Sequence, residues 1–260
     1  MHQRPVSAGI IAENPLSGLR SLPVGKRHTI RKRDFSREEL AAFLREAKAV
    51  DQESGDKVGQ YPVWLALAAT GARWGETVAL RWADVDTSRN ELFFRGEAAK
   101  SGRDRRVPIP KTLLDELLAL RRMHHDLLGR LPAGSDLVFL NPGAMPWTQR
   151  NRNDAQKRFR ELLCRAAIER ENERGRLTPH SLRHTFATHC ASYGVSMAHC
   201  QQMLGHSTIA LTAEIYTHVR TEALHLAVSR LPDPTQSDSR LGTRWALEAN
   251  SSDSASEAAS

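Results

Sequence analysis

Hydrophobic side chains recur at helical spacing in the first third of the chain and predict two helices. Ser36 and Glu39 form the pattern of a capping box, which marks a helix start. The apolar positions that follow at helical spacing are Leu40, Phe43, Leu44 and Ala47. Residues 61–70 are apolar nearly all round and end at Gly71, so we expect this second helix to be central in the core.

The pattern changes to that of strands beyond residue 90. Residues 91–95 and 106–109 read as two strands joined by a polar link, which predicts a small sheet. Because helical patterns lie before and after these strands, the predicted fold class is α+β and mainly α-helical, with a small antiparallel sheet.

A long amphipathic helix is expected over residues 112–128. Its core face is expected to hold Leu113, Leu114, Leu117, Leu118 and Leu120. His124 and His125 lie near its end, and we interpret both as surface residues because neighbouring residues on a helix point apart. Residues 137–140 are expected to form a short buried segment.

A further helix is expected over residues 148–169, with Leu162, Leu163 and Ala166 toward the core. It is rich in basic side chains, among them Arg150, Arg152, Lys157, Arg158 and Arg160. We interpret this basic face as a surface for a DNA backbone, and the alternative is ordinary solvation.

Residues 180–219 hold a polar pattern that a plain helical core does not need. Thr178-Pro179 is a good helix start, with Thr as N-cap, and His180 and Arg183 at i,i+3 share a helix face. Stops follow at Gly194 and Gly205, and caps for the next helices at Ser196 and Ser207. Hydrogen-bond donors followed by the phenol of Tyr216 favour phosphoryl chemistry, in which the donors hold phosphate oxygens and the phenol attacks phosphorus.

A second candidate region follows the central helix. Arg73 comes just after a buried segment, where a charged side chain is costly unless an anion meets it. Glu76 is one helical turn further on and can pair with Arg73. Pairing with Glu76 and a grip on phosphate are compatible roles for the same arginine.

The charge of the chain favours a polyanionic partner. The 260 residues carry a formal net charge of +7 and a sequence pI of about 9.7, while the stretch from Asp233 on is acidic. Three cysteines without a CxxC pair indicate a reducing compartment, and no apolar run approaches the roughly 18 residues of a membrane span. We expect a cytoplasmic, nucleoid-associated protein with double-stranded DNA as partner.

Three short sequences occur together, in order, in this chain: HSLRH at 180–184, LGHS at 204–207 and IYTHV at 215–219. This combination strongly resembles the C-terminal signature of the tyrosine recombinases, or phage-type integrases. The resemblance implies their catalytic-domain fold over residues 36–231. Residues 1–35 are then expected to be a basic arm or linker, a remnant of the end of a core-binding domain, and residues 232–260 a disordered tail.

The resemblance assigns six catalytic residues: Arg73, Lys100, His180, Arg183, His206 and Tyr216. Arg73 and Arg183 clamp the non-bridging phosphate oxygens, since planar forks suit phosphate better than lysine does. His206 donates another hydrogen bond to the phosphate. Glu76 matches the acidic position that supports the first arginine.

The remaining three residues handle protons and the covalent bond. His180 assists proton transfer at Tyr216, which attacks and holds the DNA as a 3′-phosphotyrosine. Lys100, in the link between the two predicted strands, protonates the departing 5′ oxygen; the alternative is a solvated hairpin lysine. No cofactor and no metal are required, and the histidine spacing fits no common zinc site.

The expected function is therefore a site-specific DNA recombinase or integrase of a mobile element, self-associating as a tetramer on DNA. Two alternatives stay open. One is a type IB topoisomerase, which uses a related residue set. The other is a DNA-binding relic or regulator without useful turnover, because the helical N-terminal domain of the family is missing from these residues.

Overall fold

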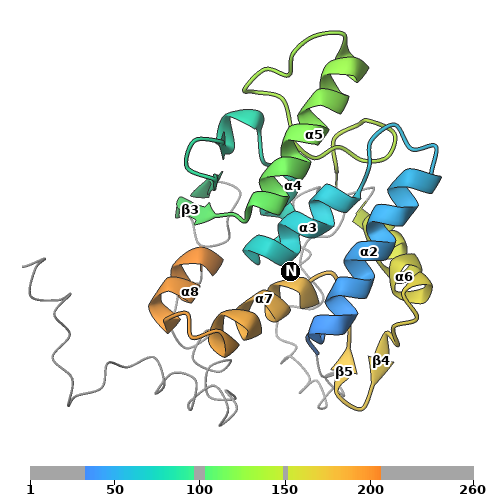
Figure 1. The fold of residues 1–260 in the computed structure, drawn as a ribbon, viewed down its shortest axis with the longest axis vertical. Coiled ribbons are helices and arrows are strands. Elements are labelled where there is room, and N and C mark those ends of the chain that lie inside the picture. The colour runs from blue at the N-terminus through green and yellow to red at the C-terminus, as the bar shows by residue number, and fades with distance from the viewer. Residues whose placement is uncertain (1–32, 97–102, 149–151, 206–260) are drawn as a thin grey trace, which may run out of the picture.

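The computed structural model describes residues 33–96, 103–148 and 152–205. These residues form helices with two small antiparallel sheets (Figure 1). The elements in chain order are α2 (Arg37–Glu53), α3 (Tyr61–Thr70), α4 (Trp74–Val78), η1 (Trp82–Asp84), β1 (Val85–Asp86), β2 (Glu91–Phe94), β3 (Arg105–Pro108), α5 (Lys111–Leu128), α6 (Arg152–Arg165), β4 (Glu171–Asn172), β5 (Gly175–Arg176), α7 (Ser181–Ser192) and α8 (Met197–Leu204).

Helix α3 lies at the centre of the molecule, and α2, α5 and α7 pack against it (Figure 1). Its bounds confirm the predicted helix over 61–70. Val63, Trp64 and Leu67 are buried, as an all-round apolar helix requires. The helix ends where Gly71 takes a left-handed conformation with φ of 61°, which glycine adopts at little cost.

The start of α2 confirms the predicted capping box. The Ser36 hydroxyl accepts from the Glu39 N–H at 3.1 Å, and the Glu39 carboxylate accepts from the Ser36 N–H at 2.8 Å. Phe43 of α2 packs against Trp64 of α3 and Phe159 of α6, with ring centroids 5.8 and 5.2 Å away. This aromatic cluster holds α2, α3 and α6 together.

The predicted small sheet is present as the antiparallel order β1-β2-β3. Leu92 pairs with Val107, and both are fully buried, because alternate side chains on each strand face the core. The strand bounds fall within one residue of the prediction. The link that contains Lys100, residues 97–102, lies outside the described residues.

Helix α5 confirms the prediction over 112–128, but the interpretation of one histidine was wrong. His124 is 1% exposed and packs edge-on against Trp82, with ring centroids 5.7 Å apart, whereas His125 is exposed. His124 follows Leu113, Leu117 and Leu120 at helical spacing, so it lies on the core stripe. The two neighbours do point apart, but only His125 points to solvent.

Helix α6 is shorter than predicted, because it ends at Arg165 and the chain then forms the hairpin β4–β5, which the pattern had not indicated. Leu162 and Leu163 are buried as expected. The basic face is partly used within the protein, since Arg158 lies 2.9 Å from Asp56. The segment 137–140 is confirmed by two buried residues at its centre, Val138 and Phe139.

Helices α7 and α8 carry the polar pattern of residues 180–205. The predicted cap at Thr178 was wrong: α7 begins at Ser181, and the Ser181 hydroxyl accepts from the Thr178 N–H at 3.0 Å. The predicted stop at Gly194 is confirmed by its positive φ of 73°. Ser196 caps α8 by accepting from the His199 N–H at 3.2 Å, and Gly205 ends this helix.

Residues 1–32 of the basic arm and the tail over residues 232–260 lie outside the described residues. In the part of the chain that the structure does describe, no helix combines the length and the hydropathy needed to cross a bilayer. The three cysteines are free, with Cys190 and Cys200 buried where α7 and α8 meet and Cys164 exposed.

Candidate functional site

Glu76 is the centre of the candidate site and holds two arginines. Its side chain is 1% exposed. Oε1 accepts from Nη1 of Arg73 at 2.8 Å, and Oε2 accepts from Nη2 of Arg105 at 2.6 Å. Oε2 also accepts from the Arg73 backbone N–H at 3.0 Å, so α4 starts with Arg73 fixed at both its backbone and its side chain.

The surroundings of Glu76 keep it ionised. Burial by itself raises the pKa of this carboxyl, but the hydrogen bond and the charge of Arg105, together with the bonds from Arg73, outweigh burial and lower the pKa below its usual 4.5. The carboxylate is therefore a fixed negative charge that orients two cations. The predicted partnership of Arg73 with Glu76 is confirmed.

Arg105 is a residue of the site that sequence reasoning missed. Its Nε donates to the Met203 carbonyl at 2.8 Å, and its guanidinium lies 4.6 Å from the centre of the Phe94 ring. Gly205 has a positive φ of 63°, and a Cβ there would lie 3.1 Å from Arg105 Nη1, so both the backbone and the close approach favour glycine at this position. A signal was available, because strand alternation places Arg105 on the same buried face as Val107.

Arg183 is buried next to Gly71, the residue that ends α3. Its Nη1 donates to the Gly71 carbonyl and its Nη2 to the Leu204 carbonyl, both at 2.7 Å. Burial, with the nearby charge of Arg73, lowers the pKa of Arg183 to about 9. The guanidinium thus remains charged at neutral pH, in a place where a bound anion would relieve the cost of burying it.

Arg73 and His180 both line one groove of about 820 Å³ on the surface of the molecule. Arg73 comes from the start of α4 and His180 from the turn before α7. His180 also packs edge-on against His184, with ring centroids 4.9 Å apart. The remaining wall of the groove includes Trp74 and Trp147.

Positive charge exceeds negative charge in this cluster. Arg73, Arg105 and Arg183 surround the single carboxylate of Glu76, and the charges of Arg73 and Arg105 both act on the pKa of Arg183. Buried charge of one sign needs an opposite charge close by. The arrangement therefore suits an anion with more than one negative charge, placed where Arg73 and His180 line the groove.

The structure brings together three of the six predicted site residues: Arg73, His180 and Arg183. Lys100, His206 and Tyr216 lie outside the described residues. Position 206 directly follows Gly205, and the preceding Leu204 carbonyl is the one that Arg183 holds. Among the described residues, no group of three or more His, Cys, Asp or Glu side chains is placed to hold a metal ion.

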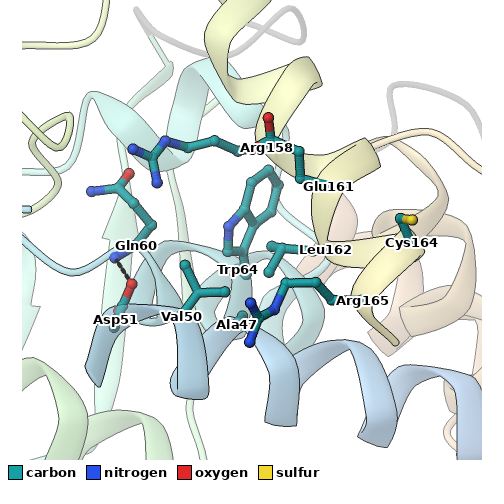
Figure 2. Close-up of a pocket in the computed structure, with 10 residues that line it drawn as sticks. All are labelled: Ala47, Val50, Asp51, Gln60, Trp64, Arg158, Glu161, Leu162, Cys164 and Arg165. Carbon is teal, nitrogen blue, oxygen red and sulfur yellow. Dashed lines mark hydrogen bonds between the residues drawn. The ribbon is translucent and has the colours of Figure 1, made fainter. Parts of the chain in front are cut away.

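A second hollow of about 440 Å³ lies between α2 and α6 (Figure 2). Trp64 forms its floor, and Arg158 and Arg165 extend from α6 beside it. At its edge Asp51 accepts from the Gln60 N–H at 2.8 Å. Burial raises the pKa of this carboxyl. None of the candidate site residues lines this hollow.

Comparison with known proteins identifies the fold. The catalytic domain of bacteriophage HP1 integrase matches with a TM-score of 0.52 and 26% identity, over 78% of this chain and 99% of that chain. The crystal structure of XerA recombinase matches with a TM-score of 0.58 and 26% identity, over 78% of this chain and 66% of that chain. The fold is therefore that of a tyrosine recombinase catalytic domain.

Sequence comparison defines the family. The model described as "Phage integrase family" matches residues 34–223. The tyrosine recombinase XerA of Pyrococcus furiosus is 31% identical over 184 residues, which cover 70% of this chain and 58% of that protein. The chain belongs to the phage integrase family, and it spans a little over half the length of the first relatives it matches.

Proposed function

We propose that this chain is a site-specific recombinase that breaks and rejoins DNA through a 3′-phosphotyrosine intermediate. The observation that carries the proposal is the cationic cluster beside the groove: half-buried Arg73, which lines the groove, and buried Arg183, with Glu76 between Arg73 and Arg105. A phosphodiester gains negative charge as phosphorus becomes pentacoordinate. Preorganised guanidinium groups stabilise that charge without having to reorganise during the reaction.

The resemblance to the phage integrase family implies a role for each group, and the chemistry of each group fits that role. Arg73, fixed by Glu76, and Arg183, fixed by two backbone carbonyls, hold the non-bridging oxygens, and His206 donates a further hydrogen bond. Tyr216 attacks phosphorus and expels the 5′ oxygen. His180 takes part in proton transfer at the phenol, and Lys100 gives a proton to the departing oxygen.

The covalent intermediate keeps the energy of the phosphodiester bond. A 5′ hydroxyl from another strand attacks the phosphotyrosine, releases Tyr216 and forms the new DNA strand, so the numbers of bonds broken and formed balance. We propose residues 36–231 as the catalytic domain that does this. Double-stranded DNA is the proposed substrate, a tetramer on DNA the proposed assembly, a mobile element the proposed source, and the nucleoid the proposed location.

Covalent trapping tests the proposal. The full chain is incubated with a pool of nicked duplexes of random sequence, in which a short fragment diffuses away after cleavage and prevents religation. The reaction is quenched in detergent and separated by size, and the DNA end attached to the protein is sequenced. We expect a protein–DNA adduct with the DNA held by its 3′ phosphate.

The matched control is Tyr216→Phe, which removes only the nucleophilic oxygen. This variant should bind the same DNA with the same dependence on salt and form no adduct. An adduct that persists in Tyr216→Phe would overturn the assignment of the nucleophile. Salt-sensitive binding without any adduct from the wild-type chain would favour a DNA-binding regulator, and relaxation of supercoiled DNA without sequence preference would favour a type IB topoisomerase.

A further inference from the structure

The groove that holds Arg73 and His180 is much larger than a phosphate requires. Its volume is about 820 Å³, and although Glu76, Thr148, Gln156 and Thr178 also line it, most of its remaining wall is apolar, with Trp74, Trp147 and Leu137 as large contributors. A phosphate bound at Arg73 would use only the polar end of the groove. The apolar end is then left for a second, apolar group.

Two half-buried indole rings form this apolar end. Trp74 and Trp147 lie with ring centroids 5.2 Å apart and planes at 81°. Trp74 is held from behind by the buried ring of Trp64, at 5.4 Å. Because Trp74 directly follows Arg73, the aromatic wall begins within one residue of the phosphate grip.

The chemistry of the two ends together selects the occupant. A nucleotide has a phosphate joined through its sugar to a flat π-face, and indole rings stack on such faces whatever the base. In an intact duplex the base faces are covered by their neighbours. Strand exchange uncovers them, because a strand with a free 5′ hydroxyl has to leave its complement before it attacks the other phosphotyrosine.

We propose that the apolar end of this groove, against the contacting pair Trp74 and Trp147, takes one unstacked nucleobase next to the phosphate that Arg73 holds. The inference rests on the proposed function, since it requires DNA at Arg73. It adds a specific role: the groove stabilises the opened strand and makes the protein sensitive to how easily that base pair opens.

Gly75 provides a way to close the groove without disturbing the fold. It lines the groove in α4, and a Cβ added there would meet nothing within 4 Å. Gly75→Leu therefore places a side chain in the space proposed for the base. Gly55 is a matched control, because a Cβ at Gly55 would also meet nothing within 4 Å and this residue does not line the groove.

The first experiment uses photocrosslinking. The cleavage site is taken from the trapped adducts, and 5-iododeoxyuridine replaces the nucleoside on one or the other side of the cleaved phosphate. After irradiation, the crosslinked peptide is identified by mass spectrometry. We expect a crosslink to Trp74 or Trp147 in the wild-type chain and in Gly55→Leu, and its loss in Gly75→Leu.

The second experiment asks whether the base itself is bound. Dissociation constants are measured for the intact site and for the same site with the base removed at the crosslinking position. We expect Trp147→Ala to weaken binding to the intact site about tenfold and Trp147→Phe to restore most of it. Neither Trp147→Ala nor Gly75→Leu should weaken binding to the abasic site.

These outcomes separate the inference from the proposed function. Normal adduct formation without a crosslink to either tryptophan would overturn the base-binding role and leave the recombinase proposal standing. A Gly75→Leu defect that is equally large on abasic DNA would also overturn it, because the groove would then contact only the backbone. Failure of the wild-type chain to form any adduct would instead remove the proposed function, and the inference with it.

Discussion

Arg105 on β3 and Glu76 on α4 form a buried ion pair, with Nη2 and Oε2 2.6 Å apart and side chains only 4% and 1% exposed. The two residues are 29 positions apart in the sequence. Glu76 also holds Arg73, and β3 is the strand that follows the segment containing Lys100. One carboxylate therefore fixes both Arg73, the first of the proposed phosphate-binding arginines, and the position of the strand that follows the segment of the predicted lysine.

Loss of Arg105 should destabilise the fold strongly. Arg105→Met leaves the Oε2 atom of Glu76 buried with only a backbone partner, and breaking a buried ion pair costs about 3 kcal/mol or more in free energy of unfolding. The matched control is Arg106→Met on the same strand, where the arginine side chain is 52% exposed and lies 4.0 Å from Asp86. We expect the control to change stability by less than about 1 kcal/mol. Urea denaturation of both variants measures the difference, and equal effects would contradict the role of Arg105.

Glu76 should make stability depend on pH in the acid range. Its pKa is lowered in the folded chain, because the hydrogen bonds and charges of Arg105 and Arg73 outweigh the effect of burial. The unfolded chain therefore takes up this proton first as pH falls, and the stabilisation is complete above about pH 4.5 and lost below it. The difference in free energy of unfolding between the wild type and Glu76→Gln should stay constant from pH 7 to pH 5. It should then shrink toward pH 3.5, and a difference that grows with acid would refute the assignment.

Local signals predicted much of this fold because their causes are local. The capping box of Ser36 with Glu39, the left-handed Gly71 and the alternation around Leu92 each depend on neighbouring residues alone. The same holds for the stop at Gly205. Arg73, His180 and Arg183 were found through the family resemblance, and the structure gathers them in one region.

The parts that sequence reasoning missed depend on distant partners. Nothing near Arg105 in the chain shows that Glu76 and the Met203 carbonyl will surround it. The shorter α6 reflects competition with the hairpin β4–β5, which local propensity does not reveal. His124 is different, because its spacing from Leu120 already placed it on the buried face of the helix. The prediction failed because it assigned both neighbouring histidines to the surface.

Gly71 and Gly75 should respond in opposite ways to alanine. Gly71 has a φ of 61°, and a Cβ there would lie 2.5 Å from the Phe186 ring, so Gly71→Ala is strained in its backbone and crowded in its surroundings. We expect it to cost at least about 2 kcal/mol and to disturb the carbonyl that Arg183 binds. Gly75→Ala meets nothing within 4 Å in a helix and should be neutral or stabilise by up to about 1 kcal/mol. Thermal unfolding distinguishes the two, and a Gly71→Ala variant as stable as Gly75→Ala would contradict the conformation of Gly71.

His124 should make the protein less stable in mild acid. Burial lowers the pKa of His124, and the charge of Asp136 opposes this only in part. The folded chain therefore keeps the ring neutral where the unfolded chain has already bound a proton, and stability falls as pH drops below about 6.5. His124→Phe should lose less stability than the wild type between pH 7 and pH 5. His125→Gln, an exposed neighbour, should follow the wild-type curve, and a His124→Phe curve parallel to the wild type would show that another group is responsible.

A substitution at Arg183 tests whether the proposed reaction needs the planar guanidinium group or only a positive charge. Its guanidinium spans two carbonyls at 2.7 Å, those of Gly71 and Leu204, and so ties the end of α3 to the end of α8 just before His206. Lysine keeps the charge but has no planar fork, so Arg183→Lys cannot hold both carbonyls and a phosphate in the same arrangement. We expect single-turnover formation of the Tyr216 adduct to fall by about 10²–10³-fold, the loss seen when one preorganised donor is removed from a transition state.

DNA affinity should change by less than tenfold, because one phosphate contact among many contributes little to the total. The control, Arg122→Lys on the exposed face of α5, should leave adduct formation unchanged. If Arg183→Lys cleaves at a near-normal rate, a point charge is sufficient and the phosphate-clamp role of the guanidinium is wrong.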